Sequence, residues 1–275
     1  MPGKELMLFS GINLLSMIKT KFLKSKYAFI IISAGILLIT GISCNHHSDI
    51  TAIKETVKNE TKNIVVNIKI SKFRSSNRRT NKNLSQFNNF RQKELNEYAD
   101  TLKSQANEVL NDLETNNKYG RPSWKYGLYV TDTVMVMIPE SFISILQTES
   151  TFTGGAHPNN IIKNYNYDLR NNKLLKKSDI INLQDSIKIN KLLYNAFSTQ
   201  NKYNIELFEQ PTLKLADAIA ITPDSIIFVY NQYTLACYAA GVIKINVSPD
   251  LIGNSLLINV PKRIQLINNF KEANN

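Results

Sequence analysis

The sequence predicts an α+β fold, with a mostly antiparallel or mixed sheet, one long helix and one or two shorter packed helices. Apolar residues recur at helical spacing through residues 84–114, which indicates the long helix. β-Branched and alternating runs lie on both sides of it, and the C-terminal part carries a hairpin pattern. The hydrophobic fraction of 43% and the charged fraction of 20% are those of an ordinary globular protein.

Residues 1–43 have the layout of an export signal. Basic residues precede an apolar run over residues 27–42, and small residues then lead to Cys44. This layout resembles a bacterial lipoprotein signal, in which the cysteine is lipidated and becomes the first mature residue. We therefore expect lipidation at Cys44, attachment to a membrane through that lipid anchor, and a location on the outer membrane or the periplasmic face.

Two alternatives concern the same region. The first is an uncleaved transmembrane anchor, although the apolar run is shorter than the roughly 20 residues that a spanning helix needs. The second concerns the start: Met17 would begin a signal of ordinary length, so residues 1–16 are expected to lie outside the true precursor.

The net charge limits which kinds of binding partner are expected. The formal net charge is +11, and residues 1–43 contribute +4 of it, which leaves about +7 on the mature chain. A basic exported protein is expected to meet anionic partners, such as lipid headgroups, envelope glycans or an acidic protein. Nucleic acid is not an expected partner for an exported chain.

The mature chain is expected to begin with a polar, lipidated tether over residues 44–62. His46 and His47 lie in it as adjacent histidines without a third ligand nearby, so we expect no metal site there. Residues 64–70 are rich in β-branched side chains and are predicted to form the first strand.

A basic run without acidic residues extends over residues 62–93. One interpretation is a solvated loop around residues 75–83. The other is a patch that rests on an anionic membrane surface near the lipid anchor. The residues of this predicted membrane-surface patch are Arg74, Arg78, Arg79 and Lys82.

The long helix is expected to expose its acidic residues to solvent, paired with neighbouring lysines. Further strands are predicted at residues 124–130, 133–138 and 141–153, with Thr131-Asp132 and Pro139-Glu140 as breaks. The remaining expected elements are a strand at 161–169, a turn at Asn171-Asn172, a helical turn capped by Ser178 or Asp179, a helix at 185–198, a hairpin at 218–230, a strand at 243–247 and a helix from Pro249.

Residues 151–159 contain the sequence Thr-Phe-Thr-Gly-Gly-Ala-His-Pro-Asn. Gly154 and Gly155 permit backbone conformations with positive φ, and Pro158 disfavours a helical conformation for His157. His157 is the one histidine of the expected folded part. Three roles stay open for it: a structural ring that hydrogen-bonds backbone, a ligand contact, or catalysis.

Tyr233, Cys237 and Tyr238 lie in one apolar segment. We interpret Cys237 as a buried, inert thiol. The two tyrosines either pack in the core, which is the favoured interpretation, or offer aromatic faces to a sugar or a protein.

The order of these segments resembles the envelope-protein family described by the paired domains DUF4163 and DUF3298. The resemblance rests on Phe152-Thr-Gly-Gly-Ala-His157, Leu174 to Ile180, Ile221-Thr-Pro-Asp224, and Tyr233-Thr-Leu-Ala-Cys-Tyr238-Ala-Ala-Gly241. It places a DUF4163-like part at residues 63–147, a DUF3298-like part at 148–255 and a C-terminal tail at 256–275. Pro158 departs from the family, which often has glycine after the histidine.

The resemblance implies an α+β fold and a recognition role at the cell envelope. Members include the lysozyme-binding extracellular part of an anti-sigma factor and a domain attached to peptidoglycan deacetylases. We therefore expect a lipid-anchored, non-catalytic module that binds a protein or a cell-wall glycan, without cofactor or metal, through Gly154, Gly155, His157, Tyr233 and Tyr238.

Two other functions stay open, a peptidoglycan-acting enzyme component and a structural lipoprotein without a small ligand. A secreted protein such as lysozyme is a possible partner of the family, but lysozymes are generally basic and a chain near +7 would repel one. Neither a nucleophile motif nor a phosphate-binding loop is evident in the sequence.

Overall fold

A computed structural model describes residues 50–116, 124–138, 141–208 and 213–259. The predicted signal, Met17, Cys44, His46, His47, Pro139-Glu140 and most of the C-terminal tail lie outside these residues. Within them, no helix combines the length and the apolar character needed to cross a membrane.

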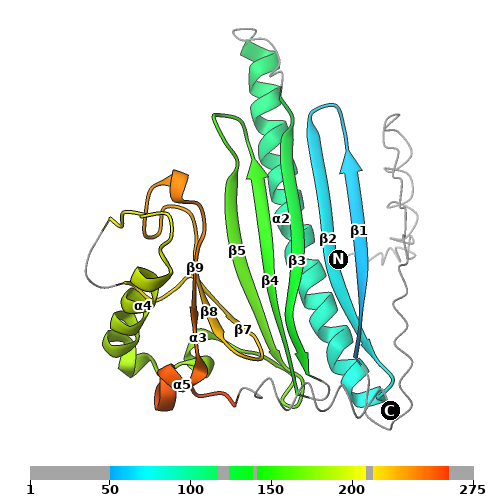
Figure 1. Cartoon of the computed structure of the whole chain (residues 1–275). Coiled ribbons are helices and arrows are strands. Elements are labelled where there is room, and N and C mark those ends of the chain that lie inside the picture. The colour runs from blue at the N-terminus through cyan, green and yellow to red at the C-terminus, as the bar shows by residue number, and fades with distance from the viewer. Residues whose placement is uncertain (1–49, 117–123, 139–140, 209–212, 260–275) are drawn as a thin grey trace, which may run out of the picture. The chain divides into compact units, whose positions relative to one another are not determined.

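A six-stranded mixed sheet is the larger of two sheets, and its strands follow the order β1-β2-β3-β4-β5-β6 (Figure 1). Every neighbouring pair is antiparallel except β2 and β3, which run parallel. Parallel strands need a long crossover, and helix α2 supplies it here. The elements are β1 (Ile50–Glu60), β2 (Ile64–Ser75), α2 (Arg78–Asn116), β3 (Tyr126–Ile138), β4 (Phe142–Phe152), β5 (Asn159–Asp168) and β6 (Lys173–Leu174).

Helix α2 packs along one face of this sheet, and the predicted long helix is confirmed. Its buried side chains follow one stripe, which includes Leu84, Phe87, Leu95, Leu102 and Leu110. They pack against the buried faces of β2 and β3, and near the start of the helix against β4 and β5.

The helix begins earlier than expected, so the interpretation of residues 75–83 as a loop is wrong. The side chain of Asn77 accepts hydrogen bonds from the N–H groups of Arg79 and Thr80, at 2.9 and 3.1 Å. An N-terminal cap of this kind satisfies amides that the first turn leaves unpaired, and it starts the helix inside the basic run.

Residues 50–60 were expected in a tether but form β1, which pairs with β2 over its whole length. The strand is at the edge of the sheet and most of its residues are exposed. An exposed edge strand carries charges on both faces and shows little alternation, and for that reason its sequence resembles a tether.

Thr131-Asp132 was expected as a break, but β3 runs through it without interruption. Asp132 is buried in the sheet and is neutralised by Arg91 of α2 at 2.7 Å. A charged residue in a strand usually signals a surface or a turn, and only the partner on the helix makes this position acceptable.

The smaller sheet has the order β7-β8-β9, with β7 (Ala218–Ile221), β8 (Ile226–Tyr230) and β9 (Ile243–Val247). It confirms the predicted hairpin and final strand. Helix α4 (Ser186–Gln200) packs on it, and the short helices are α3 (Lys177–Ile180) and α5 (Pro249–Ile252). Single 3-10 turns lie at Leu183–Asp185, Tyr238–Ala240 and Gly253–Ser255.

The two sheets are joined by side chains that take the place of a strand. The N–H of Ile219 donates to Asn164 at 3.2 Å, and its carbonyl accepts from Asn166 at 2.6 Å. The N–H of Ile221 donates to Ser144 at 3.0 Å. Strand β7 is an edge strand, so these bonds satisfy backbone groups that would otherwise be buried without partners.

Candidate functional site

The glycine-histidine loop connects β4 to β5. Gly154 and Gly155 have φ of +102° and +99°, as expected for this pair. A Cβ at Gly154 would also lie 2.9 Å from the indole of Trp124, so the loop packs closely on this aromatic ring. Both the backbone conformation and the close packing therefore require glycine at position 154.

The loop places His157 against the segment that follows β8. The rings of His157 and Tyr238 are stacked, with centroids 3.6 Å apart and an interplanar angle of 18°. The Tyr238 hydroxyl donates to the carbonyl oxygen of Pro158 at 3.0 Å. Tyr233 completes the group, with its ring centroid 5.7 Å from that of Tyr238.

The structure thus brings three predicted site residues together, and we call His157, Tyr233 and Tyr238 the aromatic cluster. Tyr233 has φ of +64° and its side chain is 57% exposed, so the favoured interpretation of this residue as core is wrong. Cys237 is also exposed, not buried as expected. Tyr233 lies in a turn closed by the hydrogen bond from the Thr234 N–H to the Asn231 carbonyl at 3.1 Å, and Cys237 directly precedes a short helical turn at residues 238–240.

His157 is exposed, and its Nδ1 lies 3.4 Å from the carbonyl oxygen of Pro158. Among the described residues no carboxylate hydrogen-bonds this ring. An activated general base needs an orienting partner of that kind. The contacts of His157 therefore suit a structural or ligand-contacting role.

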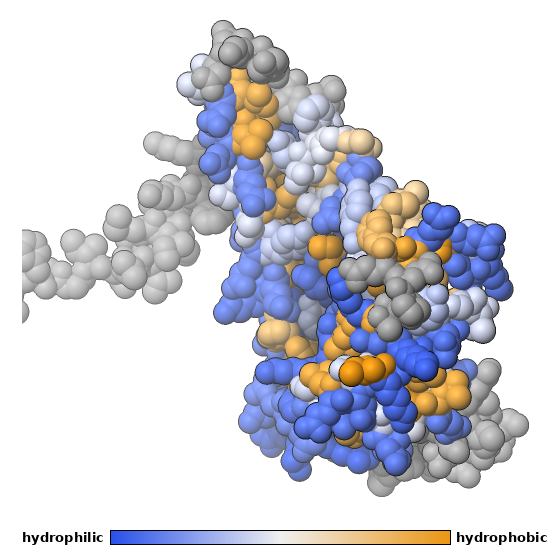
Figure 2. Space-filling model, turned by 90° about the vertical axis from the view of Figure 1, so that its left-hand side faces the viewer, coloured by the Kyte–Doolittle hydropathy of each residue, from blue (hydrophilic) through white to orange (hydrophobic). Residues whose placement is uncertain are grey.

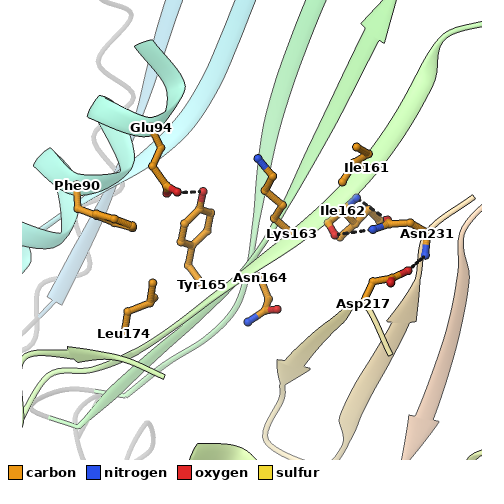
Figure 3. A pocket seen from close by; sticks show the side chains of 10 residues that line it. All are labelled: Phe90, Glu94, Ile161, Ile162, Lys163, Asn164, Tyr165, Leu174, Asp217 and Asn231. Carbon is orange, nitrogen blue, oxygen red and sulfur yellow. Dashed lines mark hydrogen bonds between the residues drawn. The ribbon is translucent and has the colours of Figure 1, made fainter. Parts of the chain in front are cut away.

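A pocket of about 330 Å³ lies between α2, β5 and the residue that follows β8 (Figure 3). Helix α2 contributes Phe90 and Glu94, and strand β5 contributes residues 161–165. Asp217, Asn231 and Leu174 close the remaining sides. A second pocket of about 210 Å³ adjoins it and shares Phe90 and Leu174.

The sequence did not point to this pocket. One signal for it was available, because Phe90 lies off the buried stripe of α2 and is 43% exposed. The other lining residues are ordinary polar and aliphatic residues, which only the fold brings together.

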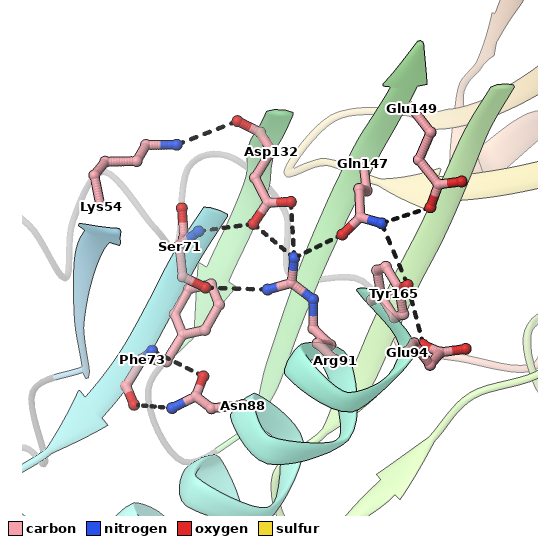
Figure 4. Close-up of polar contacts among 10 residues, drawn as sticks. All are labelled: Lys54, Ser71, Phe73, Asn88, Arg91, Glu94, Asp132, Gln147, Glu149 and Tyr165. Carbon is pink, nitrogen blue, oxygen red and sulfur yellow. Dashed lines mark hydrogen bonds and ion pairs between the residues drawn. The ribbon is translucent and has the colours of Figure 1, made fainter. Parts of the chain in front are cut away.

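A buried polar network lies beneath α2, close to the pocket (Figure 4). The Arg91 guanidinium donates to both carboxylate oxygens of Asp132 at 2.7 Å, to Gln147 at 3.1 Å and to the Ser71 carbonyl at 3.0 Å. Gln147 donates in turn to Glu149 at 2.8 Å, and Lys163 pairs with Glu149 at 2.9 Å.

Tyr165 connects this network to the pocket. Its hydroxyl donates to Glu94 at 3.1 Å, and its ring lies 4.9 Å from the Arg91 guanidinium carbon. Burial, and then the negative charge of Glu94, raise the pKa of the Tyr165 phenol well above its ordinary value. The phenol is therefore a hydrogen-bond donor at neutral pH, and it orients the Glu94 carboxylate.

The four residues of the predicted membrane-surface patch are all exposed. Arg74 lies near the end of β2, and Arg78, Arg79 and Lys82 lie in the first turns of α2. None of them takes part in the aromatic cluster or lines the pocket. Among the described residues, no group of three or more His, Cys, Asp or Glu side chains is arranged to hold a metal ion.

Two family models match the chain. Residues 174–249 match the model described as protein of unknown function DUF3298, and residues 57–160 match the model described as deacetylase PdaC. The expected resemblance to DUF3298 is confirmed by the first match. The name DUF4163 and the domain boundaries at residues 63–147 and 148–255 stay predictions.

A crystal structure of a DUF3298 family member from Bacteroides fragilis NCTC 9343 is similar, with a TM-score of 0.58 and 18% identity over 76% of this chain and 93% of that chain. At this identity the similarity concerns the fold alone. A DUF3298 family protein from Pseudomonas aeruginosa PAO1 has a TM-score of 0.49 and 13% identity, over 78% of this chain and 97% of that chain. No curated protein matches the chain.

Proposed function

We propose that this protein is a non-catalytic recognition module of the cell envelope. Its chain matches the PdaC model in the N-terminal part and the DUF3298 model after it. Its ligand is cell-wall glycan, and the contact surface is the aromatic cluster. The two family models support a peptidoglycan-related accessory role. The observation that carries the proposal is the exposed ring of Tyr233 beside the stacked His157–Tyr238 pair.

The geometry suits a sugar ring. An exposed aromatic face offers a large apolar area with little conformational freedom to lose, and a polar tip that can hydrogen-bond. The loop that carries His157 is fixed by the packing of Gly154 on Trp124 and by the hydrogen bond from the Tyr238 hydroxyl to the Pro158 carbonyl. A contact surface that is ordered before binding loses less entropy when the ligand binds.

The test is cosedimentation of the purified full-length chain with isolated peptidoglycan, for wild type and Tyr233→Ala. The loss of an aromatic contact worth about 1 kcal/mol corresponds to an affinity that is about fivefold weaker. The matched control is Tyr203→Ala, because Tyr203 is 87% exposed and lies outside the cluster. Equal losses in the two variants, or none in either, would refute the proposal.

The salt dependence of binding and a test with lysozyme distinguish glycan binding from electrostatic attraction and from binding of a protein. Glycan binding through aromatic stacking should persist at moderate salt, whereas attraction by the basic charge should weaken as salt screens it. Lysozyme is tested in parallel. Binding of lysozyme that depends on Tyr233, without binding of peptidoglycan, would make the ligand a protein.

We also propose that the chain is tethered to a membrane through a lipid on Cys44 and that Arg74, Arg78, Arg79 and Lys82 rest on anionic headgroups. All four side chains of the patch are exposed, and Thr51 at the start of β1, near Cys44 in the chain, pairs with Arg74. Cys44→Ser should release the protein from the membrane fraction. Arg78→Glu with Arg79→Glu should weaken binding to anionic vesicles and leave peptidoglycan binding unchanged.

A further inference from the structure

The free edge of β5 is closed by side chains at its start. In an antiparallel pair, every second residue directs its N–H and C=O away from the partner strand. Asn160 and Ile162 are such residues, because their N–H groups donate to the side chains of Gln232 at 3.1 Å and Asn231 at 2.7 Å. Asn231 also donates to the Ile162 carbonyl at 3.2 Å, so its side chain takes the place of a neighbouring strand.

The same edge is closed again further along, where the carbonyl of Asn166 accepts the N–H of Leu175 at 2.7 Å and β6 pairs with β5 from Tyr167 onward. Asn164 lies between these two closures. The β4–β5 pairing has no register shift, so the alternation directs the N–H and C=O of Asn164 to the free edge. Neither group has a hydrogen-bond partner among the described residues, and we call this position the β5 opening.

The pocket of about 330 Å³ lies at the β5 opening. Lys163 and Tyr165 reach the network beneath α2, whereas Ile162 and Asn164 contact the smaller sheet. All four line the same pocket (Figure 3). Residues from both faces of one strand share a pocket at the edge of that strand, where its backbone is accessible.

The direction of the two unpaired backbone groups limits what can pair with both of them. The N–H and C=O of Asn164 point to the same side, whereas a single trans amide directs its own N–H and C=O to opposite sides and can satisfy only one of them. An extended amino-acid residue between two amides directs its N–H and C=O to the same side. Two such residues exchange both bonds in an antiparallel sheet. The Asn164 backbone is therefore complementary to one residue of an extended peptide.

The β5 opening has room for three peptide residues. The two closures lie at Ile162 and Asn166, which are four residues apart, or about 13 Å at a strand rise of about 3.3 Å per residue. The residue opposite Asn164 and one residue on each side of it span about 10 Å at the same rise. A short segment therefore fits, whereas a long added strand does not.

The face toward the smaller sheet carries a negative charge. A peptide residue opposite Asn164 directs its side chain to the same face as Asn164. Asp217 lines the pocket on this side. One of its carboxylate oxygens accepts from the Asn231 N–H and the Thr234 hydroxyl, both at 2.7 Å. The other oxygen has no partner among the described residues, so this position favours a basic side chain.

The face toward α2 is more apolar. The peptide residues before and after the central one direct their side chains to this face. Phe90, which is 43% exposed, and Leu174 line the pocket there. The two faces together favour an alternation of apolar, basic and apolar side chains.

We infer that the β5 opening binds an extended segment of a partner protein, antiparallel to β5, in which a basic residue lies between two apolar residues. The basic residue donates its N–H to the Asn164 carbonyl and accepts the Asn164 N–H. On the face shown in Figure 2, hydrophobic residues form separate patches among hydrophilic ones. A partner has no broad apolar surface to bury there, which suits a short segment held by main-chain hydrogen bonds. This site is separate from the aromatic cluster and does not depend on the proposed glycan recognition.

The experiment is an NMR titration of the full-length chain with the N-acetylated tripeptide amide Leu-Lys-Leu. We expect the backbone amide signal of Asn164 to shift and its hydrogen exchange to slow, because this N–H then donates to the peptide. An ester analogue, in which oxygen replaces the N–H of the central residue, keeps the side chains and lacks the donor to the Asn164 carbonyl. It should bind about tenfold more weakly.

The mirror-image peptide is a second matched ligand, with the same charge and composition. At the same backbone direction its side chains exchange faces, so it should also bind about tenfold more weakly. Equal affinity for the peptide and its ester analogue, equal affinity for the two mirror images, or an unchanged Asn164 amide signal overturns the inference.

Two variants test the walls of the pocket. Phe90→Ala should weaken Leu-Lys-Leu binding about fivefold. Its control is Val109→Ala on the same helix, because Val109 is 44% exposed and does not line the pocket. Asp217→Asn keeps an acceptor and removes the charge. It should weaken Leu-Lys-Leu binding about threefold and leave binding of Leu-Met-Leu unchanged.

Equal losses in the Phe90 and Val109 variants, or equal losses for the two peptides in Asp217→Asn, overturn the assigned orientation of the segment. Tyr233→Ala separates this site from the aromatic cluster and should leave the Asn164 shift intact. Loss of peptide binding in that variant would assign the peptide to the cluster and overturn the inference, whatever its effect on peptidoglycan binding.

Discussion

The two sheets are stabilised in different ways. Beneath α2, the large sheet buries an ion pair in which the side chains of Arg91 and Asp132 are 1% and 0% exposed. The small sheet and α4 enclose an almost wholly aliphatic and aromatic core that includes Ile219, Phe228 and Ile245. The interface beneath α2 therefore combines apolar packing with directional hydrogen bonds, whereas the interface beneath α4 depends on the fit of apolar side chains.

The difference indicates what fixes the position of each helix along its sheet. Helix α2 is 39 residues long and its apolar side chains repeat along one stripe, so apolar packing alone specifies its position along the sheet only weakly. Arg91 fits only where Asp132, Gln147 and the Ser71 carbonyl converge. Buried polar groups can select one register in this way. The small sheet has a 15-residue helix and short strands, so apolar packing is sufficient.

The largest expected effect comes from breaking the buried ion pair. Asp132→Leu leaves the Arg91 guanidinium buried without its counter-charge and should lower the free energy of unfolding by about 3–5 kcal/mol. The double variant Arg91→Met, Asp132→Leu removes both charges and should recover part of this loss, because the Ser71 backbone groups and Gln147 still lose their buried partners. Urea unfolding followed by circular dichroism measures both. A double variant as unstable as the single one would contradict the role of the unpaired charge.

A smaller effect is expected at the junction between the two sheets. Asn166→Ala removes the donor to the Ile219 carbonyl and the acceptor of the Ser144 hydroxyl, at 2.6 and 2.7 Å. Leaving these buried groups unpaired should cost about 1–3 kcal/mol. Asn195→Ala, on an exposed position of α4, serves as the control and should change stability by less than about 0.5 kcal/mol. If both variants unfold at the same urea concentration, the junction does not contribute to stability.

The smallest effect is a dependence on alkaline pH in both regions. Burial raises the pKa of Tyr165 at the large sheet and of Tyr230 at the small sheet above the ordinary value of 10.0. The protonated phenol is thus favoured in the folded state, and this contribution is complete below pH 10 and is lost as the pH rises above it. Tyr165→Phe and Tyr230→Phe should each reduce the loss of stability above pH 10.

Tyr230→Phe tests this effect most cleanly, because the Tyr230 hydroxyl donates only to the Lys214 carbonyl, at 2.7 Å. Stability is measured from pH 8 to pH 11 for wild type and variants, so that the shared titration of lysines cancels in the difference. A constant difference across this range would show that neither phenol is linked to unfolding.

Much of the fold follows from local pattern. The stripe of α2, the hairpin of β7 and β8, and the alternation of β9 are each visible within a short window of sequence. The exceptions share one cause. Strand β1, the unbroken β3 and the buried Arg91 all depend on partners that are remote in the chain. Arg91 does lie on the buried stripe of α2, and Phe90 lies off it, so the helical pattern itself contained a signal for both.

The candidate site divides in the same way. Gly154, Gly155 and His157 stand out in the sequence, because it has one Gly-Gly pair and one histidine in the expected folded part. The contact of His157 with Tyr238 joins segments about 80 residues apart, and Tyr233 is exposed on a turn of its own, where its φ is +64°. The pocket beside β5 had no such signal, because its lining residues come from α2, β5, β6 and the smaller sheet and meet only in the folded chain.

For this protein, amino-acid order fixed the elements whose stabilising contacts are local: the amphipathic helix, the alternating strands, and the loop that requires glycine. Tertiary structure alone decided which charges are buried, which aromatic rings are exposed and which residues line the pocket beside β5. The physical reason is that helical and strand periodicity act over a few residues, whereas burial and backbone pairing depend on segments that meet only after the chain has folded.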